Sequence, residues 1–187
     1  QGLVRYHEGL SPKESAKDII RHVSDGLMIA EKHNLPNVIK DFIKTHHGTS
    51  STGYFLTTYL NEGGDPSDVA EFYYDGVKPT EKEHVILMIC DAVEAAARSL
   101  KEYTEESIQE LVNRIVDTQV SEGYFRECPL TFRDISVAKR VLGESLKTMY
   151  HTRIAYPEIG GEKKAEAEPE KRPGFFHTGL HHTWKRH

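Results

Sequence analysis

The sequence predicts an all-α protein, and three observations lead to that fold class. Apolar residues recur every three or four positions along several segments, which is the spacing of one face of a helix. A capping hydroxyl followed three positions later by a carboxylate, a pattern that starts helices, occurs at residues 11–14 and 80–83. No segment alternates apolar and polar residues convincingly over the length of a strand. We therefore expect a helical bundle.

The first two helices are expected at residues 12–32 and 36–47. Ser11 can cap the first, with proline at its first position, and its apolar stripe comprises Ile19, Val23, Leu27 and Ala30. His22 lies at the border of that stripe. The second helix leads to an adjacent pair, His46 and His47, and Gly48 is a typical helix stop.

Three longer helices are expected further along the chain, after a short aromatic helix around residues 54–59. Residues 61–78, rich in Gly, Asp and Pro, are predicted to form a mobile loop. Helices should then begin near Thr80, Thr104 and Thr131, and the core stripe of the first of these should comprise Ile86, Ile89, Cys90, Val93 and Ala97. We expect one folded unit in residues 1–158 and a charged, histidine-containing flexible tail in residues 159–187.

Composition excludes several classes of protein. A net charge of -5 argues against binding of a nucleic-acid polymer or an acidic membrane. The two cysteines have neither disulfide nor metal-site spacing, so a reducing cytoplasmic setting is expected. No run approaches the roughly 20 apolar residues that cross a bilayer. Because the chain begins with Gln1 rather than methionine, we expect a piece of a longer protein.

A metal site is predicted from one carboxylate and three histidines. Asp91 lies inside an apolar run, residues 85–93, where an unpaired ion would cost several kcal/mol, roughly, so a cationic partner is expected. With His22, His46 and His47 it makes a nitrogen and oxygen ligand set that suits iron, manganese or zinc. Adjacent helical residues point about 100° apart, so His46 and His47 are expected to serve separate ions of a dinuclear site.

Simpler interpretations of these residues stay open. A single histidine in a chain with 11 of them is more often a surface or capping residue, and a pair at a helix end can complement the helix dipole. Arg98 can form an ordinary i,i+4 ion pair with Glu94, or it can face a phosphate.

Several separated motifs resemble the HD-domain hydrolases. They lie at residues 9–16, 20–26, 45–50, 86–100 and 150–158, and are similar to the catalytic domain of membrane-anchored cyclic di-AMP phosphodiesterases of the PgpH type. The resemblance implies an HD-domain helical bundle with two divalent transition-metal ions, manganese or iron, that hydrolyses cyclic di-AMP to the linear dinucleotide. It implies His22, His46, His47 and Asp91 as metal ligands. Arg98, if it faces a phosphate, and His7, which precedes the first motif, are further expected near the substrate.

The chain departs from this family in one respect. It has no His-Asp dipeptide, the pair that names the HD superfamily. We expect the missing ligands upstream of Gln1, so that this chain is N-terminally truncated, is weakly active alone and forms homo-oligomers through exposed apolar faces. The parent protein would place it at the cytoplasmic face of the inner membrane. Alternatives are an HD hydrolase for another nucleotide, a nucleotide-binding module without catalysis, and a plain helical bundle.

Overall fold

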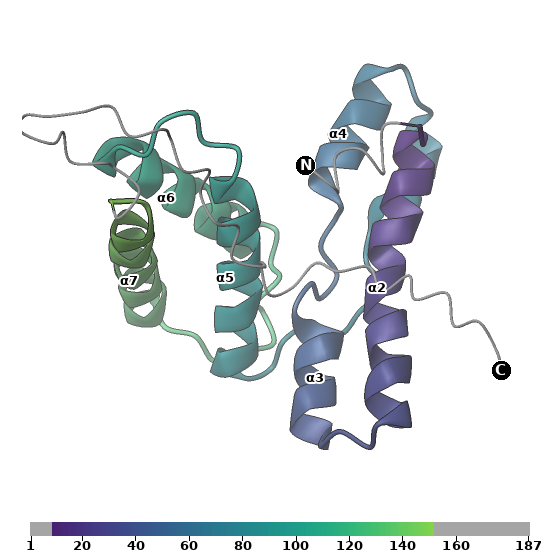
Figure 1. Ribbon diagram of the computed structural model, residues 1–187, viewed down its shortest axis with the longest axis horizontal. Helices are drawn as coiled ribbons and strands as arrows, with labels where there is room; N and C mark the ends of the chain where they lie inside the picture. The colour runs from purple at the N-terminus through teal and green to yellow at the C-terminus, as the bar shows by residue number, and fades with distance from the viewer. Residues whose placement is uncertain (1–8, 152–187) are drawn as a thin grey trace, which may run out of the picture. The chain divides into compact units, whose positions relative to one another are not determined.

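The computed structural model describes residues 9–151, and this part of the chain is helical (Figure 1). Among the described residues, strand pairing is limited to an isolated antiparallel bridge between Ser51 and Tyr73. The all-α prediction is confirmed. The elements in order are α2 (Pro12–Lys32), α3 (Asn37–Thr45), α4 (Gly53–Asn61), the 3₁₀ helix η1 (Pro66–Phe72), α5 (Lys82–Ala97), α6 (Glu105–Ser121) and α7 (Phe132–His151).

The capping box predicted at Ser11 is confirmed, whereas the one predicted at Thr80 is wrong. The Ser11 hydroxyl accepts from the Glu14 N–H, and the Glu14 carboxylate accepts from the Ser11 N–H at 2.8 Å, which is a complete capping box. Helix α5 instead has Glu81 as its N-cap, without a side-chain hydrogen bond. The third helical position is then His84 rather than an acid, so the reciprocal bond cannot form.

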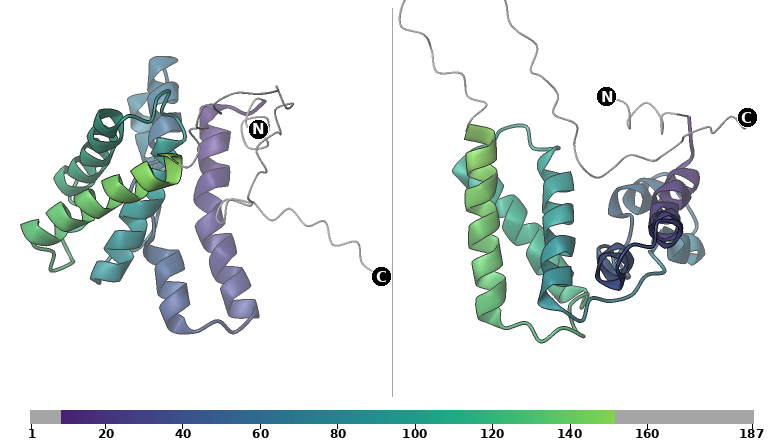
Figure 2. Two further views of the ribbon diagram at one scale, coloured as in Figure 1. Left: turned by 60° about the vertical axis from the view of Figure 1, so that its left-hand side comes forward. Right: turned by 60° about the horizontal axis from the view of Figure 1, so that its bottom comes forward.

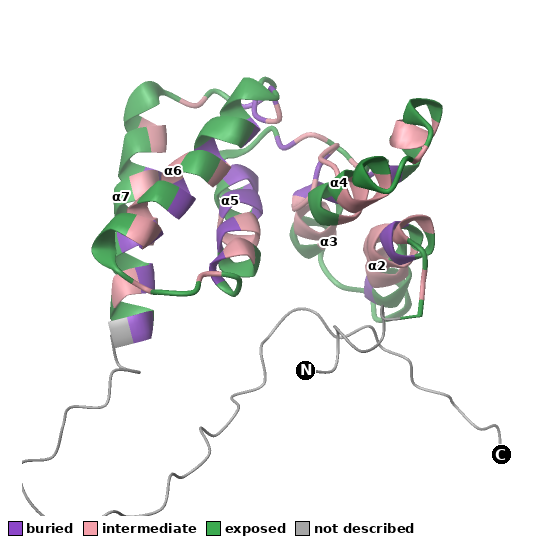
Figure 3. Ribbon diagram, turned by 90° about the horizontal axis from the view of Figure 1, so that it is seen from above, coloured by how far each residue is buried: buried purple, intermediate pink, exposed green. Residues whose placement is uncertain are grey.

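The core is built from α5, α6 and α7. In the right-hand view of Figure 2, α6 crosses behind α5 and α7, and it packs against both. Figure 3 shows buried residues where these helices face one another. The fully or nearly fully buried members include Val85, Met88, Ile89, Val93, Ile108, Leu111, Val112, Val116 and Leu146. The predicted stripe on α5 was partly wrong: Ile86 is 43 % exposed, because the buried face contains His84 and Val85 just before it.

Helix α2 packs against α3, α4 and η1, and α3 packs against α5. A close approach brings α2 and α3 together at Gly26, where an added Cβ would lie 3.3 Å from Cγ2 of Ile43. Gly26 is one turn after His22, and Ile43 is three residues before His46. The glycine therefore places the two histidines on facing sides of neighbouring helices.

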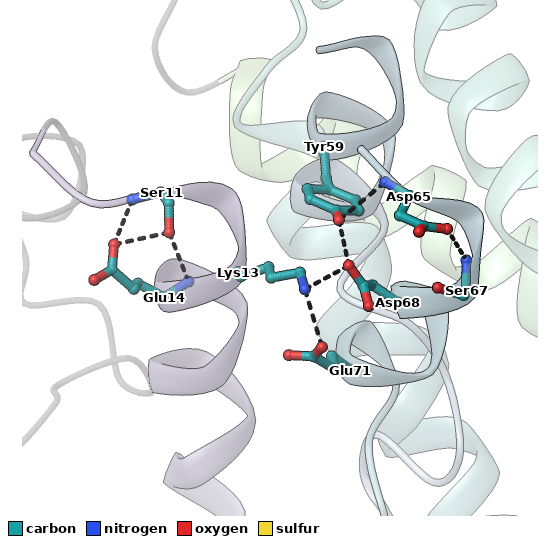
Figure 4. Close-up of polar contacts among 8 residues, drawn as sticks. All are labelled: Ser11, Lys13, Glu14, Tyr59, Asp65, Ser67, Asp68 and Glu71. Carbon is teal, nitrogen blue, oxygen red and sulfur yellow. Dashed lines mark hydrogen bonds and ion pairs between the residues drawn. The ribbon is translucent and has the colours of Figure 1, made fainter. Parts of the chain in front are cut away.

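The segment predicted as a mobile loop is instead fixed by polar contacts. Figure 4 shows Lys13 on α2 donating to Asp68 at 2.6 Å and to Glu71 at 3.0 Å, both in η1. The Tyr59 hydroxyl of α4 donates to the same Asp68 carboxylate at 2.6 Å. Phe72, at the end of η1, is fully buried. The glycine and proline content of this segment thus does not make it mobile: Gly63 lies in the turn after α4, and Pro66 is the first residue of η1.

Within residues 9–151, no helix combines the length and apolar character needed to span a membrane. The predicted boundary between residues 158 and 159, and the tail that follows it, lie outside the described residues.

Candidate metal centre

Three histidine side chains from two helices meet at one point. His22 lies in α2, His46 is the C-cap of α3, and His47 follows directly. The centroid of the His22 ring lies 5.2 Å from that of His46 and 5.0 Å from that of His47. The centroids of His46 and His47 lie 4.1 Å apart. One potential ligand atom from each residue falls within 4.8 Å of the other two. All three side chains are half-buried.

Backbone carbonyls fix the protonation of two of these rings. Nδ1 of His22 faces the carbonyl oxygen of Ile19, and Nδ1 of His46 faces that of Ile43 at 2.8 Å. A carbonyl oxygen only accepts, so each Nδ1 carries the proton. In the neutral imidazole, the other nitrogen, Nε2, then presents a lone pair, and this is the arrangement typical of metal-binding histidines.

The two Nε2 atoms point at each other, at a distance of 3.0 Å. Two lone pairs this close repel unless a positive charge lies beside them. A metal ion bonded to each nitrogen at about 2.1 Å holds neighbouring ligands about 3.0 Å apart when its bonds meet at right angles. The spacing of His22 and His46 therefore fits two ligands of one ion.

His46 and His47 converge, contrary to the expectation that adjacent residues would face separate ions. The expectation assumed a continuing helix, but α3 ends at Thr45 and the chain turns at Gly48, whose φ is +51°. Because the turn occurs here, both rings lie on the side facing His22. The three imidazoles can thus belong to one ion.

Asp91 reaches the same site from α5. Its Oδ2 lies 3.7 Å from Nδ1 of His47, with side chains 21 % and 15 % exposed respectively. This is an ion pair only when His47 is protonated, and it is too long for a hydrogen bond. The carboxylate is half-buried beside the imidazoles, and a metal ion as the cationic partner of Asp91 stays a prediction.

Tyr74 is a neighbour of the site that the sequence analysis missed. Its ring stacks on His47 with centroids 4.3 Å apart and an interplanar angle of 16°, and it meets the His22 ring edge-on. Burial raises the pKa of its phenol well above the ordinary value, and the negative charge of Asp91 adds to this, so the hydroxyl stays neutral. The only sequence signal was an aromatic cluster, Phe72 to Tyr74, inside an otherwise polar segment.

Comparison with known proteins identifies the family. The cyclic-di-AMP phosphodiesterase PgpH of Bacillus subtilis is 38% identical over 152 residues, covering 81% of this chain, and PgpH of Listeria monocytogenes is 36% identical. The crystal structure of the L. monocytogenes PgpH HD domain in complex with cyclic-di-AMP matches with a TM-score of 0.73 and 35% identity, over 80% of this chain and 70% of that chain. The chain belongs to the PgpH family of HD-domain phosphodiesterases.

The match to PgpH proteins concerns one region of them. The chain spans about a fifth of the length of the curated PgpH relatives, 21% in both cases. A protein of Synechocystis described as uncharacterized is 32% identical over 157 residues. No family model matches the chain.

The two residues predicted to face a PgpH substrate remain predictions. Arg98 forms the bidentate i,i+4 pair with Glu94, at distances of 2.7 to 3.0 Å, and both side chains are 48 % exposed. The structure thus shows the ordinary ion pair that was the alternative interpretation. His7 lies outside the described residues.

Proposed function

We propose that this chain forms part of a phosphodiesterase domain that hydrolyses cyclic di-AMP to its linear dinucleotide with the help of two divalent transition-metal ions, manganese or iron. Membership of the PgpH family supports the reaction class, and the related domain that was solved with cyclic-di-AMP supports the substrate. A cyclic dinucleotide carries two phosphodiesters, and the net charge of this chain is -5. The positive charge that binds the phosphates must therefore be local, and bound metal ions supply such a charge.

The observation that carries this proposal is the facing pair of Nε2 atoms of His22 and His46. Both nitrogens are oriented by main-chain carbonyls, and their separation of 3.0 Å fits one ion. A proton shared between the two rings would also relieve the repulsion. The third imidazole and the Asp91 carboxylate favour the metal, because a shared proton needs neither of them.

We propose that the ligands are shared between two ions. The ligand atoms of His22, His46 and His47 lie together and would hold the first ion, and Asp91, whose Oδ2 lies 3.7 Å from Nδ1 of His47, would contribute to the second. Mixed imidazole and carboxylate ligands suit manganese and iron better than magnesium or calcium. Ions held here would supply Lewis acidity and compensate the negative charge that develops on a phosphodiester under attack.

The side chains of this site have separate tasks. The imidazoles hold the ions and fix their position relative to α2 and α3, while Asp91 balances their charge from α5. Tyr74, buried and neutral, keeps water from one side of His47. The chain contains no His-Asp dipeptide and spans 70% of the solved PgpH HD domain, so we propose that further ligands come from elsewhere in the full protein.

The test measures metal content by elemental analysis and cyclic di-AMP hydrolysis by chromatography. Both are measured on this chain and on a longer form of the protein that spans a whole HD domain. We expect bound manganese or iron in both forms, weaker in the short one, and turnover in the longer form. His22→Ala and His46→Ala should abolish metal binding, whereas His33→Ala, at an exposed histidine that ends α2, should not.

Two outcomes favour other functions. Binding of cyclic di-AMP without hydrolysis in the metal-loaded longer form would indicate a nucleotide-binding module, and faster turnover of a different nucleotide would change the substrate. Absence of metal in both forms would refute the metal centre itself. The Arg98→Ala variant separates its two interpretations: a rise in KM supports contact with the phosphate, and an unchanged KM supports the surface ion pair.

The cellular setting is also part of the proposal. We propose that the full-length protein is membrane-anchored and carries this domain at the cytoplasmic face, as the family resemblance implies. Homo-oligomer formation stays a prediction, supported by apolar side chains that are largely exposed, such as Met28 at 65%, Val38 at 57% and Phe132 at 92%. Light scattering at micromolar concentration measures it, and a monodisperse monomer would contradict it.

A further inference from the structure

We propose that Tyr74 is a positioning residue for the metal centre: its ring fixes the plane of the His47 imidazole and thereby the direction of the His47 ligand nitrogen. This inference rests on the proposed function, since it concerns a ligand of the proposed centre. Tyr74 lies 17 residues before Asp91 and 27 after His47, outside every motif that indicated the site.

The stacking geometry is the first part of the argument. The Tyr74 and His47 rings are nearly parallel, at 16°, with centroids only 4.3 Å apart. A histidine ring at fixed χ1 can still rotate about χ2, which is a broad torsion with little preference of its own. Rotation would drive the edge of the imidazole into the face of Tyr74. The stacked ring therefore removes the freedom that the torsion leaves.

Tyr74 can fix the plane of the His47 ring only if its own position is fixed, and the structure shows the contacts that fix it. The side chain is 7% exposed, so surrounding atoms prevent it from moving aside. Its N–H donates to the Ser50 carbonyl at 2.8 Å, and the preceding Phe72 carbonyl accepts from the Thr52 N–H at 2.7 Å. These bonds tie residues 72–77, which we call the brace segment, to the chain just after His47.

Gly76 allows the brace segment to lie this close. At Gly76 an added Cβ would overlap the Gly48 carbonyl oxygen and would lie 3.2 Å from that of Lys44. Gly48 directly follows His47, so the brace segment crosses the turn that presents both adjacent histidines. Val77 completes the contact through its N–H, which faces the Lys44 carbonyl at 3.5 Å.

The three histidines are thus oriented by two different means. Main-chain carbonyls in their own helices orient His22 and His46. The plane of His47 is fixed by a side chain from a distant segment, which also touches His22 edge-on with centroids 6.1 Å apart. Groups that orient metal ligands typically change metal affinity by about 10- to 100-fold when they are removed.

The experiment titrates Co²⁺ into the metal-free chain and into its variants, because the visible absorption of Co²⁺ reports both affinity and coordination geometry. Tyr74→Leu removes the flat ring and should weaken Co²⁺ binding about tenfold or more and alter the absorption spectrum. Tyr74→Phe keeps the ring and should bind within about twofold of the wild type, with its spectrum. Tyr73→Leu, at the neighbouring exposed residue, is the matched control.

Thermal unfolding of each metal-free variant separates orientation from folding. A wild-type affinity and spectrum in folded Tyr74→Leu would overturn the inference. If Tyr74→Leu does not fold, the Tyr74→Phe variant tests the inference instead. A loss of Co²⁺ affinity in Tyr74→Phe would assign the role to the hydroxyl group and refute stacking. Failure of both the wild-type chain and the longer form to bind Co²⁺ would instead overturn the proposed metal centre, and this inference with it.

Discussion

Substitution of Gly76 by alanine should damage the fold and the metal site together. The new Cβ would lie closer than 3.0 Å to the Gly48 carbonyl oxygen, and 3.2 Å from the Gly48 carbonyl carbon and the Lys44 oxygen. All three are backbone atoms, so no side-chain rotation can relieve the overlap. The φ of Gly76 is outside the left-handed region, so the cost is steric rather than conformational. Either the brace segment or the histidine turn must move.

The expected loss of stability in Gly76→Ala follows from the free-energy cost of adding atoms to a well-packed protein interior. Such substitutions typically destabilise by 1–3 kcal/mol, so we expect about 2 kcal/mol here. For a folded unit of this size, that corresponds to a fall in Tm of about 4–8 °C. Displacement of the brace segment also moves Tyr74, so the affinity for Co²⁺ should fall as well.

The assay is thermal unfolding followed by circular dichroism, with Co²⁺ titration of the same samples. Gly53→Ala is the matched control, because an added Cβ there would meet only the Ser51 hydroxyl, at 3.9 Å. We expect its Tm to stay within about 2 °C of the wild type or to rise, since alanine restricts the unfolded chain. A Gly76→Ala protein with wild-type Tm and wild-type affinity would refute the close approach of the two segments.

Two further predictions concern polar contacts away from the metal centre. The Lys82 hydrogen bond, with those from Thr131, lowers the pKa of Asp134 from 3.8 to about 2. The folded state thus favours ionised Asp134, so its stabilisation is present above about pH 4 and lost as the pH falls toward 2. Urea unfolding should show the wild type approaching Asp134→Asn in stability over that interval, and a constant difference would contradict this. Lys13→Met should speed amide hydrogen exchange in η1 while leaving α6 unchanged, and equal exchange in η1 would show that this contact does not fix the segment.

The helices were predictable because local patterns decide them. Ser11, Pro12 and Glu14 form a start signal whose partners lie within one turn, and α2 begins and ends where that signal and its apolar stripe indicate. The same kind of reasoning gave the wrong cap for α5. Glu81, not Thr80, is the N-cap there, and Val85, the fourth helical residue, is fully buried.

The candidate site was predictable in its residues and only partly in its geometry. The residues His22, His46, His47 and Asp91 were selected by chemistry and resemblance, and the structure brings them together. The convergence of the adjacent histidines depends on where α3 ends, which a helical-wheel argument does not include. The role of Tyr74 depends on contacts between segments far apart in sequence, and no local pattern encodes these.

The carbonyl groups that orient His22 and His46 have a consequence for protein engineering. Each acceptor belongs to the main chain three residues earlier, so it is present whatever side chain occupies Ile19 or Ile43. The orientation of these nitrogens is therefore set by the backbone of the same segment and not by neighbouring side chains. Two helices that cross at a glycine, with a histidine on each near the crossing, form a portable half-site. Transplanted into an unrelated helical scaffold, this pair should present two lone pairs at metal-binding distance without further redesign of the interior.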